Sequence, residues 1–147
     1  MSASVGVELA GKQLHARPHS RCFVCGQDNP AGLKIAFRRM EGDGVAAAWT
    51  PETPWEGFRG IVHGGLVSTV LDEAMSKAVA ASGNEALTAE LRVRFRLPVR
   101  SKETFAIRGW IVRRNKRLIE TEAVLTDLRG IEHSHAWGRF LSLLKAK

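Results

Sequence analysis

Residues 61–75 read IVHGGLVSTVLDEAM, and this stretch decides the fold. A histidine and two glycines lead into a run of apolar residues, which predicts a helix over 66–82 that Gly83 ends. The helix is apolar nearly all round, and a helix of that kind is normally buried. Two adjacent acids, Asp72 and Glu73, nevertheless stand inside it, and their presence calls for a chemical reason.

Alternating apolar and polar residues around this helix predict a sheet. The period of two is cleanest over 87–97, and Pro98 ends it. Strands are expected at 33–38, 45–50, 87–97, 103–113, 117–127 and 131–143. Two strands, one buried helix and four strands predict an α+β fold in which a curved antiparallel sheet wraps around the central helix. Such a sheet has open edges, which edge-to-edge dimerisation would protect.

Length and composition are those of one globular domain. The chain has 147 residues, of which 44% are hydrophobic and 25% charged, and this is enough to form a core. We expect a peripheral N-terminal segment over 1–21 and a single domain over 22–147. No apolar run approaches the ~20 residues that cross a bilayer, and residues 1–21 lack the apolar stretch of a secretion signal. A cytoplasmic location and no membrane partner are therefore expected.

The net charge of +7 admits three kinds of anionic partner. They are nucleic acid, an anionic membrane and a polyanionic small molecule. The basic residues recur among apolar residues in 92–100 and 113–117 rather than in one tail, and a solvated surface explains them equally well. Because the sequence has no basic recognition helix and no recognisable binding motif, no nucleic-acid partner is expected.

Cys22 and Cys25 form a single C-x-x-C motif. The motif supplies two of the four ligands of a structural zinc site, and the spacing of His15 and His19 upstream matches no zinc pattern. A redox C-x-x-C normally follows a strand and opens a helix, and no strand pattern precedes this one. Two reduced thiols packed near the N-terminus are the favoured interpretation, with no metal and no cofactor.

The turn His63-Gly64-Gly65 is suited to bind an oxygen atom that becomes negative. A helix N-terminus offers unpaired N–H groups and a partial positive charge, and glycine allows close approach to them. Asp72 lies in the third turn of the same helix. Burial raises the pKa of a carboxylate and makes it a stronger base, so Asp72 either activates a water or attacks a carbonyl itself. Ser68, one turn earlier, is placed to hydrogen-bond Asp72 or a substrate.

Both features also have ordinary structural explanations. Glycines are common in loops, and a lone aspartate in an apolar helix can be a satisfied core group. Glu73 is the weaker candidate for the acid, because Lys77 at i+4 can pair with it at the surface. If Gly64 and Asp72 both act, they lie about 12 Å apart along the helix. One carbonyl meets both only where two antiparallel helices face each other across a two-fold axis, which predicts a site shared by a dimer.

The segment GIVHGGLVSTVLDEAM (60–75) resembles the hotdog-fold acyl-CoA thioesterases, in particular the branch of the phenylacetate-pathway and 4-hydroxybenzoyl-CoA thioesterases. The shared pattern is His-Gly-Gly, six residues, then an acid. TAELRVRFRLPV (88–99) is similar to the family's strand after the helix, and LTDLRGIEHSHAWGRF (125–140) to its last hairpin. CFVCGQDNPAGL (22–33) is similar to an N-terminal segment of some members. The resemblance covers roughly 22–143 and implies a hotdog fold.

The resemblance also implies an activity, the hydrolysis of a small aryl- or acyl-CoA by a homodimer or homotetramer. Asp72 would be the general base or nucleophile. The Gly64 amide, with that of Gly65, would polarise the thioester carbonyl, and His63 would orient the turn or touch the thioester. Many relatives carry Asn six residues before this histidine, where the chain has Gly57. That departure leaves an alternative, a hotdog protein that binds acyl-CoA without hydrolysing it.

Further residues are candidates for contacts with the substrate. By resemblance, Thr88 and Glu90 lie near the site at the start of their strand. Trp55 and Phe58 either line an acyl pocket or plug the core. Because coenzyme A is a polyanion, arginines of the basic strands can bind its phosphates, although a solvated sheet face explains each of them too. These arginines are Arg96, Arg100, Arg113 and Arg114.

Overall fold

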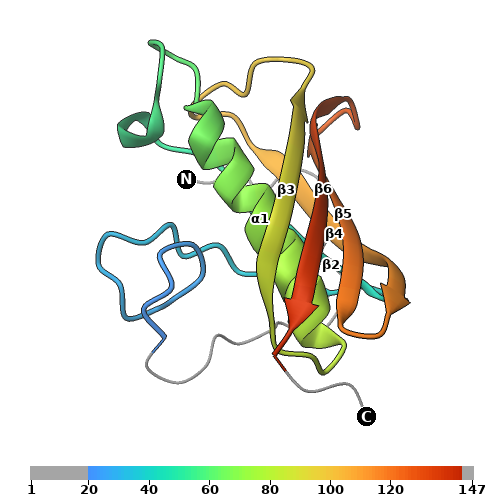
Figure 1. Ribbon diagram of the computed structural model, residues 1–147. Helices are drawn as coiled ribbons and strands as arrows, with labels where there is room; N and C mark the ends of the chain where they lie inside the picture. The colour runs from blue at the N-terminus through green and yellow to red at the C-terminus, as the bar shows by residue number, and fades with distance from the viewer. Residues whose placement is uncertain (1–19, 144–147) are drawn as a thin grey trace.

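In the computed structural model of the chain, which describes residues 20–143, one long helix lies across a single antiparallel sheet (Figure 1). The predicted segment 1–21 and the last residues of the predicted domain, 144–147, lie almost entirely outside the described range. The elements are β1 (Arg38–Arg39), β2 (Gly44–Trp49), the 3-10 helix η1 (Thr53–Trp55), α1 (Gly64–Ala81), β3 (Ala86–Phe95), β4 (Phe105–Asn115), β5 (Leu118–Asp127) and β6 (Glu132–Ser142). Their order confirms the predicted sequence of two strands, one long helix and four strands.

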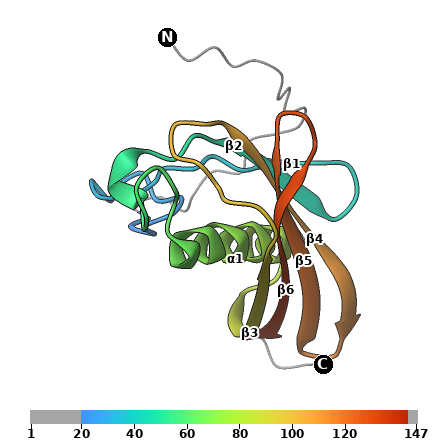
Figure 2. The ribbon, with the colours of Figure 1, turned by 90° about the horizontal axis from the view of Figure 1, so that it is seen from above.

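The sheet has the strand order β1-β2-β4-β5-β6-β3, so β1 and β3 form its edges. All neighbouring pairs are antiparallel, and β3 pairs with β6 from Ala86↔Ser142 to Phe95↔Ser134. Figure 2 shows that the sheet curves and that α1 lies along its inner side. The strand that follows the helix in sequence is therefore also the strand whose outer edge has no neighbour among residues 20–143.

One stripe of α1 packs on the sheet and is buried. Its residues are Val67, Val70, Leu71, Ala74, Met75, Ala78 and Val79. The helix approaches β4 so closely that a Cβ on Gly109 would lie 2.5 Å from the Ala74 carbonyl oxygen. On another side α1 is covered by residues 20–37, from which Val24, Ile35 and Phe37 join the same core. An apolar helix with a sheet on one side and a loop on another is the arrangement that its sequence predicts.

Two boundaries differ from the predictions for identifiable reasons. The helix begins at Gly64, two residues before the predicted start, because His63 supplies the N-cap. Of the strand predicted over 33–38, only Arg38 joins the sheet, in β1. The preceding backbone instead bonds to the cysteine-containing turn, from the Leu33 N–H to the Phe23 carbonyl at 2.7 Å. No helix within residues 20–143 has the length and hydrophobicity that crossing a bilayer requires.

Candidate active site

Backbone hydrogen bonds hold the His-Gly-Gly turn at the start of α1. The His63 N–H donates to the Trp55 carbonyl at 2.9 Å, and the Val62 N–H donates to the Val99 carbonyl at 2.8 Å. The His63 ring caps its own helix, because Nδ1 accepts the Gly65 N–H at 2.9 Å. Nδ1 is therefore an acceptor, and in the neutral ring the proton lies on Nε2. The ring of His63 thus holds the turn in its own chain, and a contact of His63 with the thioester stays a prediction.

The two glycine amides of this turn have different environments. The Gly65 N–H is occupied by the His63 ring, so it is not available to a substrate oxygen, in contrast to the predicted pair of donors. The Gly64 N–H has no hydrogen-bond partner within residues 20–143. It is the first N–H of the helix, where the partial positive charge of the helix is concentrated. A Cβ on Gly64 would lie 3.5 Å from the Phe95 ring, so this residue faces β3.

A groove of about 630 Å³ opens beside the Gly64 amide. It is formed by the loop before α1, the start of α1 and the segment that leaves β3. The lining residues are Gly57, Phe58, Ile61, Val62, His63, Gly64, Val67, Phe95, Arg96, Leu97, Pro98 and Val99. The volume and the mostly apolar lining are typical of a small-molecule site. Phe58 lines this groove and is 83% exposed, so it does not plug the core; its contact with an acyl group stays a prediction.

Trp55 lies away from the groove. It lines a second, smaller hollow of about 290 Å³ on another side of His63, with Leu66 and Thr69. Gly57 faces the turn, because a Cβ there would lie 3.3 Å from the His63 Cα. The position at which relatives carry Asn is therefore next to the site, and this chain places no side chain there.

Asp72 is half-buried on the side of α1 that faces β3. Burial raises the pKa of Asp72 above its ordinary value, and a hydrogen bond from Thr88 partly opposes that rise. The Thr88 hydroxyl donates to Asp72 Oδ1 at 2.8 Å, which agrees with the prediction for Thr88. The Ser68 hydroxyl instead donates to the Gly64 carbonyl at 2.9 Å, so it is not the donor to Asp72. A half-buried carboxylate with one hydroxyl partner is suited to accept a proton.

A β-bulge at the start of β3 directs Thr88 toward Asp72. The register with β6 shifts between Thr88 and Glu90, so the alternation of side chains changes phase there. Thr88 points to the helix side, whereas Glu90 points to the outer side and pairs with Arg139 at 3.6 Å. The uninterrupted alternation expected over 87–97 would have put both residues on one face; instead Glu90 lies on the face away from Asp72 in its own chain, and its place near the site stays a prediction.

The four predicted arginines are divided between the two ends of the sheet. Arg96 lines the groove and pairs with Glu132 at 2.7 Å, and Arg100 is exposed beside Ile61. Arg113 and Arg114 lie near the β4–β5 turn, about 20–25 Å from the level of the groove at ~3.3 Å per strand residue. Arg113 and Arg114 therefore lie far from the groove of their own chain, and Arg113 is paired with Glu120; their contact with phosphate stays a prediction.

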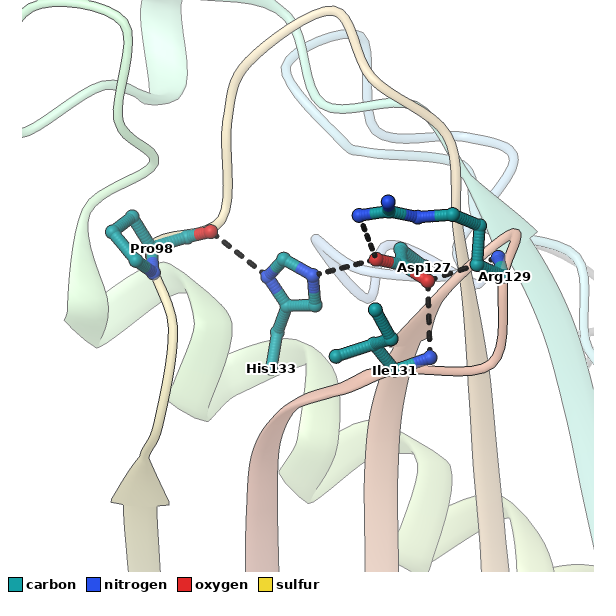
Figure 3. A network of polar contacts seen from close by, with 5 residues as sticks. All are labelled: Pro98, Asp127, Arg129, Ile131 and His133. Carbon is teal, nitrogen blue, oxygen red and sulfur yellow. Dashed lines mark hydrogen bonds and ion pairs between the residues drawn. The ribbon is translucent and has the colours of Figure 1, made fainter.

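A polar network holds the groove wall at Pro98 (Figure 3). The His133 Nδ1 donates to the Pro98 carbonyl at 2.9 Å, and its Nε2 lies 3.1 Å from Asp127 Oδ2. The other Asp127 oxygen accepts the N–H groups of Arg129 and Ile131. Partial burial acts to raise the pKa of Asp127, but hydrogen bonds from Ile131, His133 and Arg129 hold it below its ordinary value. Pro98 lines the groove, and the four residues behind it support this wall without lining the groove themselves.

The other acid of the helix, Glu73, faces the C-x-x-C motif. Both Glu73 carboxylate oxygens lie 3.8 Å from Cys22 Sγ, and no ion pair joins Glu73 to Lys77 within residues 20–143, contrary to the prediction. The donor atoms of Cys22, Cys25 and Glu73 all lie within 4.8 Å of one another, and we call these residues the thiol cluster. Burial, with the nearby Glu73, raises the pKa of Cys25 to about 12. His15 and His19 lie outside the described residues.

Comparisons with known proteins place this geometry in a family. Residues 59–132, from just before the His-Gly-Gly turn into β6, match the family model of the thioesterase superfamily. A search of curated proteins by sequence gave no match. Among solved structures, a thioesterase superfamily protein aligns with TM-score 0.79 and 25% identity over 82% of this chain. The chain spans 62% of that protein's length.

Two further solved structures share the fold at lower identity. A hypothetical thioesterase from Streptococcus pneumoniae, solved with coenzyme A, aligns with TM-score 0.71 and 15% identity over 77% of this chain and 91% of its own. The Escherichia coli PaaI protein, from the phenylacetic acid degradation operon, aligns with TM-score 0.69 and 16% identity over 74% and 83%. The predicted hotdog fold is confirmed.

Proposed function

The chain belongs to the thioesterase superfamily, and on that premise we propose that it hydrolyses the thioester of a small aryl- or acyl-CoA. One observation carries the proposal: the unpartnered Gly64 N–H and the half-buried Asp72 carboxylate lie on the same side of α1, beside β3. The first is a donor for a developing oxyanion, and the second is a base. No metal or cofactor takes part in the proposed reaction.

The two groups divide the chemistry of hydrolysis. The thioester carbonyl oxygen accepts the Gly64 N–H, and a donor of this kind contributes about 3–4 kcal/mol to the transition state of acyl transfer. Asp72 either takes a proton from an attacking water or attacks the carbonyl carbon itself. The C–S bond then breaks and coenzyme A leaves as the thiol. The raised pKa of Asp72 favours the first role, because a stronger base takes the proton more readily.

The site is shared between two copies of the chain. Gly64 and Asp72 are about 12 Å apart along α1, so they cannot act on one carbonyl within the same chain. Thr88, beside Asp72, and Phe95, beside Gly64, lie equally far from the midpoint between Leu91 and Arg92. If two β3 edges pair antiparallel about that midpoint, each Asp72 faces the Gly64 of the other chain. β3 is an edge strand with exposed apolar residues, of which Phe95 is 53% exposed.

The groove offers separate surfaces for the two parts of an acyl-CoA. Apolar residues from Phe95 to Val99, together with Phe58, suit an aryl or aliphatic acyl group. Arg96 and Arg100 lie next to this surface and are suited to phosphate oxygens. Solved relatives include the Streptococcus pneumoniae protein with coenzyme A and a Streptococcus mutans protein bound to acetyl-CoA, which supports coenzyme A as the carrier.

A panel of aryl- and aliphatic acyl-CoA substrates, assayed by release of free thiol, tests the hydrolase. We expect turnover of at least one small member and its loss in Asp72→Ala. The absence of a side chain at Gly57 favours the second candidate, an acyl-CoA-binding protein without turnover. Saturable acyl-CoA binding with no thiol released over hours would support that candidate and reject the hydrolase.

Mixed dimers test the shared site separately. Asp72→Asn and Gly64→Pro chains should each be inactive alone, because every site lacks one group. When both are co-expressed, half of the dimers are mixed, and each mixed dimer has one intact site. Activity should recover to roughly a quarter of the wild-type rate. If mixed dimers form and no activity returns, the two groups do not act together across the interface.

A further inference from the structure

The thiol cluster joins two segments that are far apart in sequence. Cys22 and Cys25 come from the N-terminal segment, whereas Glu73 comes from the middle of α1. Cys25 is buried, and the other two residues are half-buried. Two thiols and a carboxylate thus lie together between the N-terminal segment and α1, where apolar side chains could have filled the same space.

The backbone around the two cysteines is tightly fixed. The Gly26 N–H donates to the Cys22 carbonyl at 2.7 Å, which closes the turn that brings the thiols together. A Cβ on Gly26 would lie 2.5 Å from the Cys22 nitrogen and 2.6 Å from its carbonyl oxygen, so only glycine fits. The Ile35 N–H, which donates to the Val24 carbonyl at 2.9 Å, ties the turn to the core. The donor atoms are therefore held in place before any ligand binds.

From this convergence we propose that Cys22, Cys25 and Glu73 bind a zinc ion. Zinc takes Cys sulfur at about 2.3 Å and carboxylate oxygen at about 2.0–2.2 Å in a tetrahedron. Those bond lengths separate a sulfur and an oxygen ligand by about 3.5 Å, and two sulfurs by about 3.8 Å. The Cys22 sulfur and the Glu73 oxygens are 3.8 Å apart. The other pairs of donor atoms lie within 4.8 Å of one another, so shifts of up to about 1 Å complete the geometry.

The donor set selects zinc among the common cations. Magnesium and calcium require oxygen ligands, whereas two thiolates favour a softer ion. Three protein ligands occupy three corners of the tetrahedron, and the fourth corner is left for a water molecule or another donor. The ion would fasten residues 20–35 to the helix that carries Asp72, and this role does not depend on the proposed hydrolase function.

Metal content of the full chain, purified without an affinity tag, tests the site. We expect about one zinc per chain by elemental analysis. Cys22→Ser and Glu73→Gln should each weaken zinc binding by at least roughly tenfold, the loss seen when even an indirect partner of a metal is removed. Glu103→Gln changes an exposed acid outside the thiol cluster; it is the matched control and should bind zinc like the parent. Zinc in the parent no higher than in Cys22→Ser overturns the proposal.

Cobalt substitution gives a second measurement that does not depend on the variants folding. Cobalt bound to the metal-free parent chain should show the strong visible bands of a tetrahedral site and a sulfur-to-cobalt charge-transfer band. The two cysteines, the only ones in the chain, should then be protected from thiol reagents. A cobalt spectrum without sulfur bands, or two cysteines that oxidise to a disulfide equally fast with and without zinc, would reject the site.

Discussion

Asp72 and Glu73 are successive residues on one helix, and the structure gives them opposite surroundings. Asp72 faces β3 and meets one hydroxyl, from Thr88. Glu73 faces the N-terminal segment and meets the thiols of Cys22 and Cys25. The two side chains carry the same charged group. The partners of a half-buried carboxylate, rather than its presence in an apolar helix, therefore decide what chemistry it supports.

The two sides of α1 also differ in how far one chain completes them. On the N-terminal side Val24, Ile35 and Phe37 are buried and form part of the core. On the β3 side Leu91, Phe95 and Leu97 remain between 38% and 53% exposed. In the proposed dimer a second chain completes the β3 side, whereas the thiol cluster lies wholly within one chain.

Exchanging each acid for its amide should have the largest effect. Asp72→Asn should lower kcat/KM by about 10²–10⁴-fold, the range expected when a general base is lost. Its zinc content should not change. Glu73→Gln should lose zinc and have a far smaller effect on hydrolysis. Equal losses of hydrolysis in the two variants would mean that the acids do not have separate roles.

The same exchange has a consequence for stability. Burial raises the pKa of Asp72 in the folded chain above its ordinary value of 3.8. The free energy of unfolding therefore falls as the pH rises from the pKa of the unfolded chain to that of the folded chain. Asp72→Asn has no such charge to bury. It should therefore be at least as stable as the parent at neutral pH by thermal unfolding, so lost activity cannot be assigned to an unfolded chain.

Removing the Gly64 N–H should have the next largest effect. Gly64→Pro deletes the donor at the first position of the helix, where proline is well tolerated. His63 has ψ 131°, a value that suits a residue before proline. We expect kcat to fall about 10²–10³-fold, as for a lost oxyanion donor.

Gly64→Ala is the matched control for that variant, since it adds a methyl group and keeps the N–H. The added Cβ would be in ordinary contact with the Phe95 ring at 3.5 Å. Stopped-time assays at saturating substrate compare the two. Similar rates for Gly64→Pro and the parent would remove this amide from the mechanism.

The smallest effect should come from Thr88→Val, which removes the hydroxyl and keeps the shape. The Thr88 hydrogen bond lowers the pKa of Asp72 against the effect of burial, so its loss should raise that pKa further. The acid limb of the pH profile of kcat/KM should move to higher pH. At a pH below the pKa of Asp72, kcat/KM of Thr88→Val should be about fivefold lower than that of the parent, which corresponds to a net hydrogen bond of ~1 kcal/mol.

Thr88→Ser retains the hydroxyl and should keep the parent profile. A limb that moves to lower pH in Thr88→Val would contradict the assigned role of the hydroxyl. An unchanged limb would show that Asp72 is not the group whose protonation stops the reaction.

Much of the fold follows from periodicity in the sequence. The apolar run after His63 and the alternation in the later strands gave the helix, the hairpins and the single curved sheet. Helical spacing alone also gave the separation of Gly64 from Asp72 and hence the expectation of two chains per site. These features depend on local pattern, which one sequence displays directly.

Features that depend on local irregularity or on tertiary contact were not predictable in this way. The bulge after Thr88 inserts a residue into the alternation without any glycine or proline to mark it. The alternation therefore put Thr88 on the same outer face as Glu90, whereas Thr88 points to the helix. The contact between Glu73 and Cys22 requires residues 20–35 to fold back onto α1. Lys77, at i+4 in the same helix, is a local signal, and it led to the wrong predicted partner for Glu73.

Gly109 and Gly138 lie in the sheet below Ala74 and Met75, the two residues that follow Asp72 and Glu73 in α1. A Cβ on Gly109 would lie 2.5 Å from the Ala74 carbonyl oxygen, and one on Gly138 would lie 2.9 Å from Met75 Sδ. The helix thus packs closely against the sheet at these two glycines, which fix its distance from the sheet. A methyl group on Gly109 would push α1 away from the sheet and move the carboxylates of Asp72 and Glu73 with it. A single added atom on the sheet would therefore disturb two unrelated sites.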